Sequence, residues 1–188
     1  MKIVLASSSP RRRELMRLIT DDFEVRVSDA DESLPENIIA ENAAEYLSAK
    51  KAEALALNPG EIVIGCDTVV VTNGKILGKP SSESECRKML SALSGRIHTV
   101  FTGVTILSQD KRRSFTSETK VRFFALSEKE ISDYIATGEP FDKAGGYGIQ
   151  GKGALLVKDI EGDFFNVVGL PVSRLRRELD DFIENDCN

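Results

Sequence analysis

A run of β-branched and apolar residues extends from Ile62 to Val71. Such a run predicts a central strand that is covered on both faces. Asp67 lies in its middle, and burying an ionised carboxylate is costly unless it is paired, bound to a metal or facing a wet cleft. Asp67 is therefore either a structural acid bonded to backbone amides or a functional acid, and the rest of the pattern bears on this choice.

The predicted strand is followed by a hairpin signal. Asn73-Gly74 is typical of a type I′ turn, and an apolar segment returns from Lys75 to Gly78. We expect this hairpin to bring Lys79 back towards the strand that holds Asp67.

The N-terminal pattern predicts a strand, a turn and a helix. A short strand is predicted from Lys2 to Ala6, of which residues 3–6 are apolar, and Ser7 to Ser9 form a Ser-rich turn. Ser9 is a favourable N-cap and Pro10 a favourable first helical residue. Such a helix start presents free N–H groups and the positive end of the helix dipole, which together attract an anion.

Three arginines, Arg11 to Arg13, occupy the first turn of this helix. Cations at that place oppose the helix dipole, and a broken local rule of this kind often marks a functional site. Guanidinium groups match phosphate oxygens in bidentate fashion. The turn therefore favours a polyphosphate site, and a solvated basic helix start is the alternative.

A longer helix is predicted over residues 36–57, stopped by Asn58-Pro59-Gly60. Lys51 falls inside its apolar stripe, which is formed by Ala40, Ala44, Leu47, Ala54 and Leu55. A lysine on such a face either extends its ammonium to solvent or points it into a cleft at an anion.

The second half of the chain predicts hairpins between capped helices. Capping boxes at 82–85 and 127–130 predict the starts of two helices. Strands are expected over residues 97–107, 114–125, 154–160 and 164–168. A last amphipathic helix is predicted through Leu175, Leu179, Phe182 and Ile183, with residues 184–188 frayed. The fold class is therefore α/β: a long mixed β-sheet with flanking helices and two lobes around a central cleft. We expect one domain over residues 1–188.

Composition and charge exclude several classes. The net charge of -5 argues against binding to duplex nucleic acid. No apolar run approaches the roughly 18 residues of a membrane span, and no signal peptide precedes the first strand. We therefore expect a cytoplasmic protein with no membrane partner.

The cysteines and the single histidine point to structural roles. Cys66, Cys86 and Cys187 are odd in number and form no CxxC pair, so neither a disulfide framework nor a thiolate zinc site is indicated. Cys66 is favoured as a core residue over a nucleophile. A structural hydrogen bond is favoured for His98, since a lone histidine cannot build a His-rich metal site.

The segment from Gly138 to Gly153 contains six of the fourteen glycines. Its backbone must turn sharply or approach something closely, although hairpins alone explain part of the count. It carries Asp142, Lys143, Tyr147 and Gln150. Such a set can read a base edge, because an amide matches the imide group of uracil or thymine.

Several of these segments together resemble the Maf family of nucleoside triphosphate pyrophosphatases. The resemblance covers nearly the whole chain and rests on the segments 6–12, 65–68, 78–80, 93–96, 141–151 and 168–171. Cys66 and Gly146 stand where alanine is commoner in the family. The resemblance implies a fold similar to that of inosine triphosphatases.

The resemblance also implies roles for individual residues. Asp67 would be the catalytic proton acceptor and, with Glu32, would hold a divalent metal cation, Mg or Mn; without the resemblance the acidic cluster 29–32 would be a solvated loop. The segment 142–150 resembles the branch acting on dTTP and UTP rather than 7-methyl-GTP. The implied substrate-specificity residues are Arg12, Thr68 and Gln150; the phosphate-binding residues are Ser7, Ser9, Arg11, Arg12, Lys51 and Lys79; the base-binding residues are Tyr147 and Gln150.

The predicted activity is hydrolysis of the α–β phosphate bond of dTTP and UTP, and of modified pyrimidine analogues, to a monophosphate and pyrophosphate, as a house-cleaning reaction. A nucleotide-binding regulator of cell division with little turnover is the alternative, and a general phosphatase is a weaker one. A homodimer stays open, because the sequence has no readable signature of oligomeric state.

Overall fold

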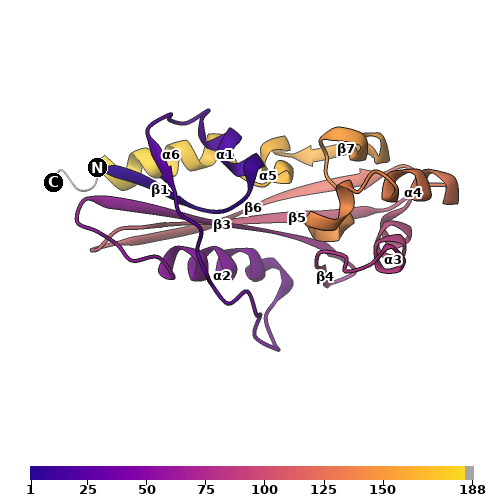
Figure 1. The fold of residues 1–188 in the computed structure, drawn as a ribbon, viewed down its shortest axis with the longest axis horizontal. Helices are drawn as coiled ribbons and strands as arrows, with labels where there is room; N and C mark the ends of the chain where they lie inside the picture. Colours follow the sequence, from indigo (N-terminus) through magenta and orange to yellow (C-terminus); the bar gives the residue numbers. More distant parts are fainter. Residues whose placement is uncertain (185–188) are drawn as a thin grey trace. The chain divides into compact units, whose positions relative to one another are not determined.

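The computed structural model describes residues 1–184 (Figure 1). Residues 185–188 lie outside the described part, and with them Cys187 and most of the segment expected to fray. The strands are β1 (Lys2–Ala6), β2 (Phe23–Val25), β3 (Glu61–Thr72), β4 (Lys75–Leu77), β5 (Ile97–Leu107), β6 (Arg112–Phe123) and β7 (Val157–Gly162).

The helices complete the α/β pattern. They are α1 (Pro10–Met16), α2 (Ala40–Glu53), α3 (Glu83–Leu93), α4 (Glu128–Ile135), α5 (Phe164–Val168) and α6 (Val172–Glu184), with 3-10 turns η1 (Glu139–Asp142), η2 (Ala144–Gly146) and η3 (Gly151–Leu156). No helix within residues 1–184 is both long and apolar enough to cross a membrane.

The strands form a seven-stranded sheet in the order β2-β1-β3-β5-β6-β7, with β4 paired to β3. β1 is parallel to β2 and β3, whereas β4 is antiparallel to β3 and β7 is antiparallel to β6. The sheet is therefore mixed, and the predicted fold class of a mixed sheet with flanking helices is confirmed.

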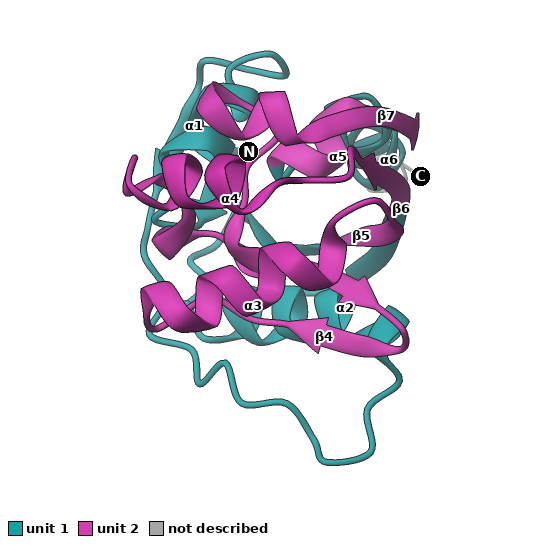
Figure 2. Cartoon of the chain, turned by 90° about the vertical axis from the view of Figure 1, so that its right-hand side faces the viewer, with its two compact units in different colours: residues 1–67, 102–117, 169–188 teal, residues 68–101, 118–168 magenta. Residues whose placement is uncertain are grey.

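The chain divides into two compact units, coloured separately in Figure 2. The first contains residues 1–67, 102–117 and 169–188, and the second contains residues 68–101 and 118–168. β3, β5 and β6 each pass from one unit into the other, so the units are continuous through the sheet strands. The single domain over residues 1–188 stays a prediction.

In the first unit, α2 covers one face of the strands, and α1 and α6 lie on the other face (Figure 1). Two glycines allow α2 to approach closely. A Cβ atom on Gly65 would lie 2.1 Å from the carbonyl oxygen of Ser48, and one on Gly103 would lie 2.2 Å from that of Ala44. The buried face of α2 is correspondingly small-chained, consisting of Ala43, Ala44, Leu47, Ser48, Ala49 and Ala52.

The second unit has its own apolar core, which includes Val70, Leu90, Phe123 and Tyr147. Ser127 opens α4 with a complete capping box. At α3 the Ser82 hydroxyl accepts from the N–H of Glu85 as expected, but the Glu85 carboxylate accepts from the N–H of Ser81. The glutamate of this capping box therefore bonds the residue before the N-cap instead of the N-cap itself.

Two predicted element assignments are wrong. Residues 164–168 form α5 rather than a strand, because the Asp163 carboxylate accepts from the N–H of Phe165 at 2.8 Å and Asn166 is buried against Val100 and Thr119. Residues 151–156 form η3, so the following strand begins only at Val157. The β propensity of residues 164–168 is outweighed by the hydrogen bonds of the Asp163 carboxylate and of the buried Asn166 amide.

The long helix is shorter than predicted. α2 spans Ala40–Glu53 rather than residues 36–57, and Ala54 is exposed although the periodicity placed it in the stripe. The apolar periodicity of the sequence extends beyond Glu53, whereas the close contacts of α2 with Gly65 and Gly103 involve residues 44–52. Tertiary packing of this kind supplies most of the stability of a helix.

Candidate active site

The first unit holds several of the predicted site residues near the carboxyl end of β1, at a level where the parallel strand β3 continues beyond it. Leu5 and Ala6 of β1 pair with Ile64 and Gly65 of β3. The Ser-rich turn leaves β1 at this level, and Asp67 follows two residues after Gly65. Ligands of α/β proteins commonly bind outside the carboxyl ends of parallel strands.

The turn and the start of α1 form as the sequence predicts. Ser9 is the N-cap and its hydroxyl accepts from the N–H of Arg12 at 3.4 Å, with Pro10 as the first helical residue. The Ser7 hydroxyl accepts from the N–H of Ser9 at 3.2 Å. Arg11 and Arg12 are partly buried, whereas Arg13 is exposed. The two serine hydroxyls and the first two arginines therefore belong to one structured turn.

Arg12 is anchored by a carbonyl from a distant part of the chain. Its Nε donates to the carbonyl oxygen of Gly169 at 2.9 Å, and one terminal nitrogen donates to the Ser7 hydroxyl at 3.4 Å. The Cys66 thiol donates to the same Gly169 oxygen at 3.2 Å. The sequence alone indicated no role for Gly169. Its φ of 125° lies in a region that favours glycine, so the signal available in the sequence was the glycine itself.

Lys51 lies between two carboxylates. Its ammonium donates a hydrogen bond to Asp67 and forms an ion pair with Glu32 at 3.0 Å. The side chains of Lys51 and Asp67 are 13% and 11% exposed, whereas that of Glu32 is 56% exposed. Of the two orientations open for Lys51, the structure shows the inward one, with the acidic residues of the site as partners.

The charges of Arg12, Lys51 and Asp67 all act on the thiol of Cys66. It is fully buried, and burial raises the pKa of its thiol; the charge of Asp67 raises that pKa further, while Arg12 and Lys51 lower it. A buried thiol of raised pKa is a poor nucleophile, which supports the prediction of a core residue. Because Arg12, Lys51 and Asp67 all act on this thiol, they share one neighbourhood of the first unit.

The donor set of Asp67 and Glu32 fits a hard divalent cation. Both carboxylates turn towards one point, which the Lys51 ammonium marks, and oxygen ligands suit Mg²⁺ or Mn²⁺. Within residues 1–184 no cluster of three or more acidic, histidine or cysteine ligands is present. Such a pair of carboxylates is typical of a magnesium site that substrate phosphates and water complete.

The second unit holds the remaining predicted residues. Thr68 follows Asp67 along β3, and exposed Lys79 follows β4. The hairpin between them is confirmed: Val70 pairs with Leu77, and Asn73 and Gly74 have φ of 50° and 71°, as a type I′ turn requires. The approach of Lys79 to Asp67 stays a prediction.

Tyr147 lies in the core of the second unit. Its hydroxyl is hydrogen bonded to Nε2 of His98 at 2.7 Å, its ring contacts that of Phe123 edge-on at 4.7 Å, and burial raises its pKa. The structural hydrogen bond predicted for His98 is thereby confirmed. Base binding by Tyr147 stays a prediction, and the structure adds a packing role.

Gln150 lies on the surface of the second unit, directly before η3. The backbone around it turns sharply, with positive φ at Gly145, Gly146 and Gly151. The glycine-rich stretch is therefore a succession of 3-10 turns, and the expected sharp turning is confirmed.

The sequence is similar to those of known proteins over nearly its whole length. The family model of Maf-like proteins matches residues 2–182. A dTTP/UTP pyrophosphatase of Geobacillus sp. (strain WCH70) is 54% identical over 179 residues, covering 95% of this chain and 96% of the relative. A dTTP/UTP pyrophosphatase of Bacillus cereus (strain AH187) is 50% identical over 182 residues, covering 96% of this chain and 95% of the relative.

The fold also occurs in solved structures of low sequence identity. A HAM1 protein from Coxiella burnetii superposes with a TM-score of 0.52 at 14% identity, covering 96% of this chain and 99% of the other. The family match spans nearly all of the described residues, including both serines, Arg12, Lys51 and Asp67. The chain therefore belongs to the family of Maf-like proteins.

Proposed function

We propose that this protein is a nucleoside triphosphate pyrophosphatase that hydrolyses dTTP and UTP to the monophosphate and pyrophosphate. The observation that carries the proposal is the buried Lys51–Asp67 pair, with Glu32 on the same ammonium, in the unit that also holds the arginine-rich turn. The names of the relatives that are 50% and 54% identical over nearly the full chain support the choice of substrates.

The triphosphate is bound by the Ser7–Ser9 turn, the first N–H groups of α1, Arg11, Arg12, Lys51 and Lys79. Arg12 supplies a guanidinium whose orientation is set by Gly169 and Ser7. Charged donors of this kind stabilise the negative charge that develops on the departing pyrophosphate.

Asp67 accepts a proton from the attacking water. The water oxygen bonds to the α-phosphorus, the bond from that phosphorus to the bridging oxygen breaks, and pyrophosphate leaves. Asp67 and Glu32 would hold Mg²⁺ or Mn²⁺, and when bound such a cation supplies Lewis-acid polarisation of a phosphoryl oxygen.

Arg12, Thr68 and Gln150 select the pyrimidine. Gln150 is the residue suited to the base, because its amide has a donor and an acceptor that match the imide edge of uracil and thymine. A base whose hydrogen-bond donors and acceptors do not match this amide leaves a polar group of the site unpaired. Such unpaired groups are the usual reason why an enzyme strongly prefers one substrate over another.

A panel of nucleoside triphosphates tests the function. Purified protein with Mg²⁺ or Mn²⁺ is given dTTP, UTP, CTP, dCTP, GTP and ATP, and phosphate is detected with and without added inorganic pyrophosphatase. We expect signal from dTTP and UTP only with the coupling enzyme. Direct phosphate release would indicate a phosphatase, and tight binding without turnover would favour the regulatory alternative.

A further inference from the structure

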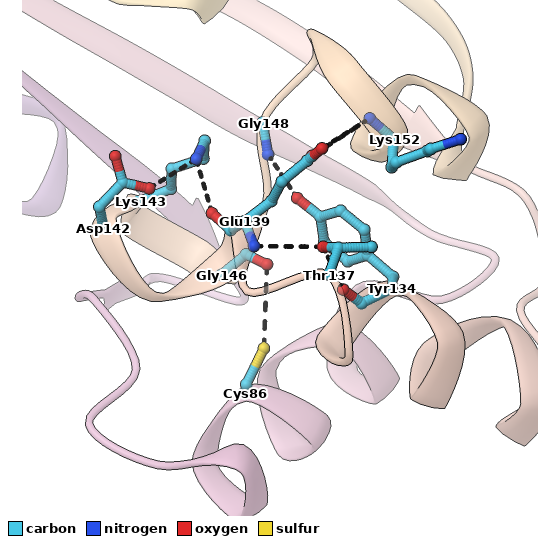
Figure 3. A network of polar contacts seen from close by, with 9 residues as sticks. All are labelled: Cys86, Tyr134, Thr137, Glu139, Asp142, Lys143, Gly146, Gly148 and Lys152. Atoms are coloured by element: carbon cyan, nitrogen blue, oxygen red, sulfur yellow. Dashed lines mark hydrogen bonds and ion pairs between the residues drawn. The ribbon is translucent and has the colours of Figure 1, made fainter.

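The segment 148–152, which carries Gln150, is held at both ends by side chains of one neighbouring stretch (Figure 3). The hydroxyl of Tyr134, at the end of α4, accepts from the N–H of Gly148 at 3.2 Å. The carboxylate of Glu139, in η1, accepts from the N–H of Lys152 at 3.1 and 3.2 Å through its two oxygens. We infer that Glu139 and Tyr134 are positioning residues for Gln150; this rests on the role proposed for Gln150 in pyrimidine selection.

The held segment closes tightly on itself. A Cβ atom on Gly153 would lie 2.1 Å from the carbonyl oxygen of Gly148 and 2.8 Å from the Tyr134 hydroxyl. Gly151 has a φ of 64°, and a Cβ there would lie 2.9 Å from the Glu139 carboxylate. The glycines of this loop therefore allow its backbone to reach the two side chains that hold it, and Gln150 is left at the exposed tip.

Glu139 is fixed through its backbone, and Tyr134 is fixed by burial. The N–H of Glu139 donates to the Thr137 hydroxyl at 3.1 Å, and the Lys143 ammonium donates to the Glu139 carbonyl oxygen at 2.6 Å (Figure 3). Tyr134 is 4% exposed. Burial raises the pKa of Tyr134 to about 12, so its hydroxyl stays neutral at the near-neutral pH of the assays.

Fixing this loop matters because an amide discriminates only from a defined position. An exposed glutamine on a loose loop loses side-chain and backbone entropy when it engages a base, and a displaced amide can pair with the wrong edge. Held at Gly148 and Lys152, the loop presents Gln150 from one backbone position before the nucleotide arrives. Preorganisation of this kind lowers KM for the matching base more than it changes kcat.

The inference is tested by the ratio of kcat/KM for UTP to that for CTP. Glu139→Ala leaves the N–H of Lys152 without its charged acceptor, and we expect the UTP preference to fall roughly tenfold, mainly through a higher KM for UTP. Tyr134→Phe keeps the ring and loses the acceptor of Gly148, so a smaller fall of the same sign is expected. Glu161→Ala is the matched control, because that carboxylate is 79% exposed and forms an ion pair with Lys120 at 3.4 Å on the surface of the same unit.

A double-variant cycle separates this inference from the proposed role of Gln150. Gln150→Ala alone should reduce the UTP preference, and Glu139→Ala added to it should reduce it no further, because Glu139 acts through Gln150. If Gln150→Ala leaves the preference intact, the proposed role of Gln150 fails. If it abolishes the preference while Glu139→Ala and Tyr134→Phe leave it intact, the positioning inference is wrong.

Glu139→Gln tests whether the effect of Glu139→Ala comes from the lost hydrogen bond or from general destabilisation of the fold. It keeps an acceptor oxygen of similar reach without the charge, so its UTP preference should lie between those of wild type and Glu139→Ala. Amide hydrogen exchange at Lys152 should be faster in Glu139→Ala than in wild type and Glu161→Ala, with thermal unfolding measured alongside. Unchanged exchange at Lys152 in a folded Glu139→Ala protein would also overturn the inference.

Discussion

Lys51 and Asp67 form an ion pair that is withdrawn from solvent, with side chains 13% and 11% exposed. The pair joins α2 to the part of β3 that lies, like α2, in the first unit. A buried pair is strongly unfavourable to break because the remaining charge has neither partner nor water. The arrangement therefore ties the stability of this unit to the acid that the proposed reaction requires.

Asp67→Asn should abolish most of the pyrophosphatase activity. The amide occupies the same volume but cannot accept a proton, and loss of a general base costs on the order of 10²- to 10⁴-fold in rate. Pyrophosphate release from dTTP in the presence of metal measures the effect. Asp29→Asn, an exposed acid of the same unit, should keep full activity. Near-normal turnover of Asp67→Asn would contradict the assigned role.

Lys51→Met should destabilise the protein much more than Lys50→Met. The first change leaves Asp67 buried without its cation at a cost of about 3 kcal/mol in the free energy of unfolding. The neighbouring Lys50 pairs with Asp31, whose side chain is 72% exposed, so its loss should change stability little. Urea unfolding of both variants checks this, and equal midpoints would speak against a buried pair.

Arg12→Lys should raise KM for dTTP about tenfold, because lysine cannot donate to Gly169 while presenting a fork to the phosphates. Arg13→Lys is the matched control, since Arg13 is exposed on the same helical turn. Steady-state kinetics of both variants provide the measurement. A similar effect of both substitutions would point to general charge rather than an anchored guanidinium.

His98 should make stability depend on pH in a defined window. Burial lowers the pKa of this histidine from 6.5 to about 4, so between these values the unfolded chain binds a proton that the folded chain does not. Its contribution is complete above pH 6.5 and is lost as the pH falls to about 4, amounting to about 3 kcal/mol.

Comparison with His98→Gln isolates this contribution, because the carboxylates titrate in both proteins and His98 is the single histidine of the chain. The free energy of unfolding of the wild type should fall more steeply from pH 6.5 to 4. Tyr147→Phe should retain the steeper slope, since burial and not the hydroxyl is the cause. Parallel curves for wild type and His98→Gln would rule the effect out.

Gly103→Ala should destabilise the packing of α2 on the sheet. The added Cβ would lie 2.2 Å from the backbone of Ala44, and overpacking of a rigid contact costs about 2 kcal/mol. Gly78→Ala meets nothing within 4 Å and should leave the thermal midpoint almost unchanged. Equal midpoints for the two variants would mean that the helix moves away without cost.

Local signals in the sequence were sufficient for much of the framework. The apolar run that contains Asp67, the Asn73-Gly74 hairpin and the Ser9–Pro10 helix start depend on residues close in the chain, and all three form as predicted. The strand at 164–168 failed because Asn166 is held by Val100 and Thr119, which lie 66 and 47 residues away. Periodicity carries no information about such distant partners.

The sequence by itself determined which residue types are available: hydroxyls before α1, guanidiniums in its first turn, a carboxylate inside an apolar strand, and an amide in a glycine-rich loop. Only the tertiary structure decided that Lys51 pairs with Asp67 and Glu32, that Gly169 anchors Arg12, and that Glu139 holds the loop of Gln150. The physical reason is that hydrogen bonds and ion pairs between distant segments depend on distance and burial, which packing sets and local pattern does not.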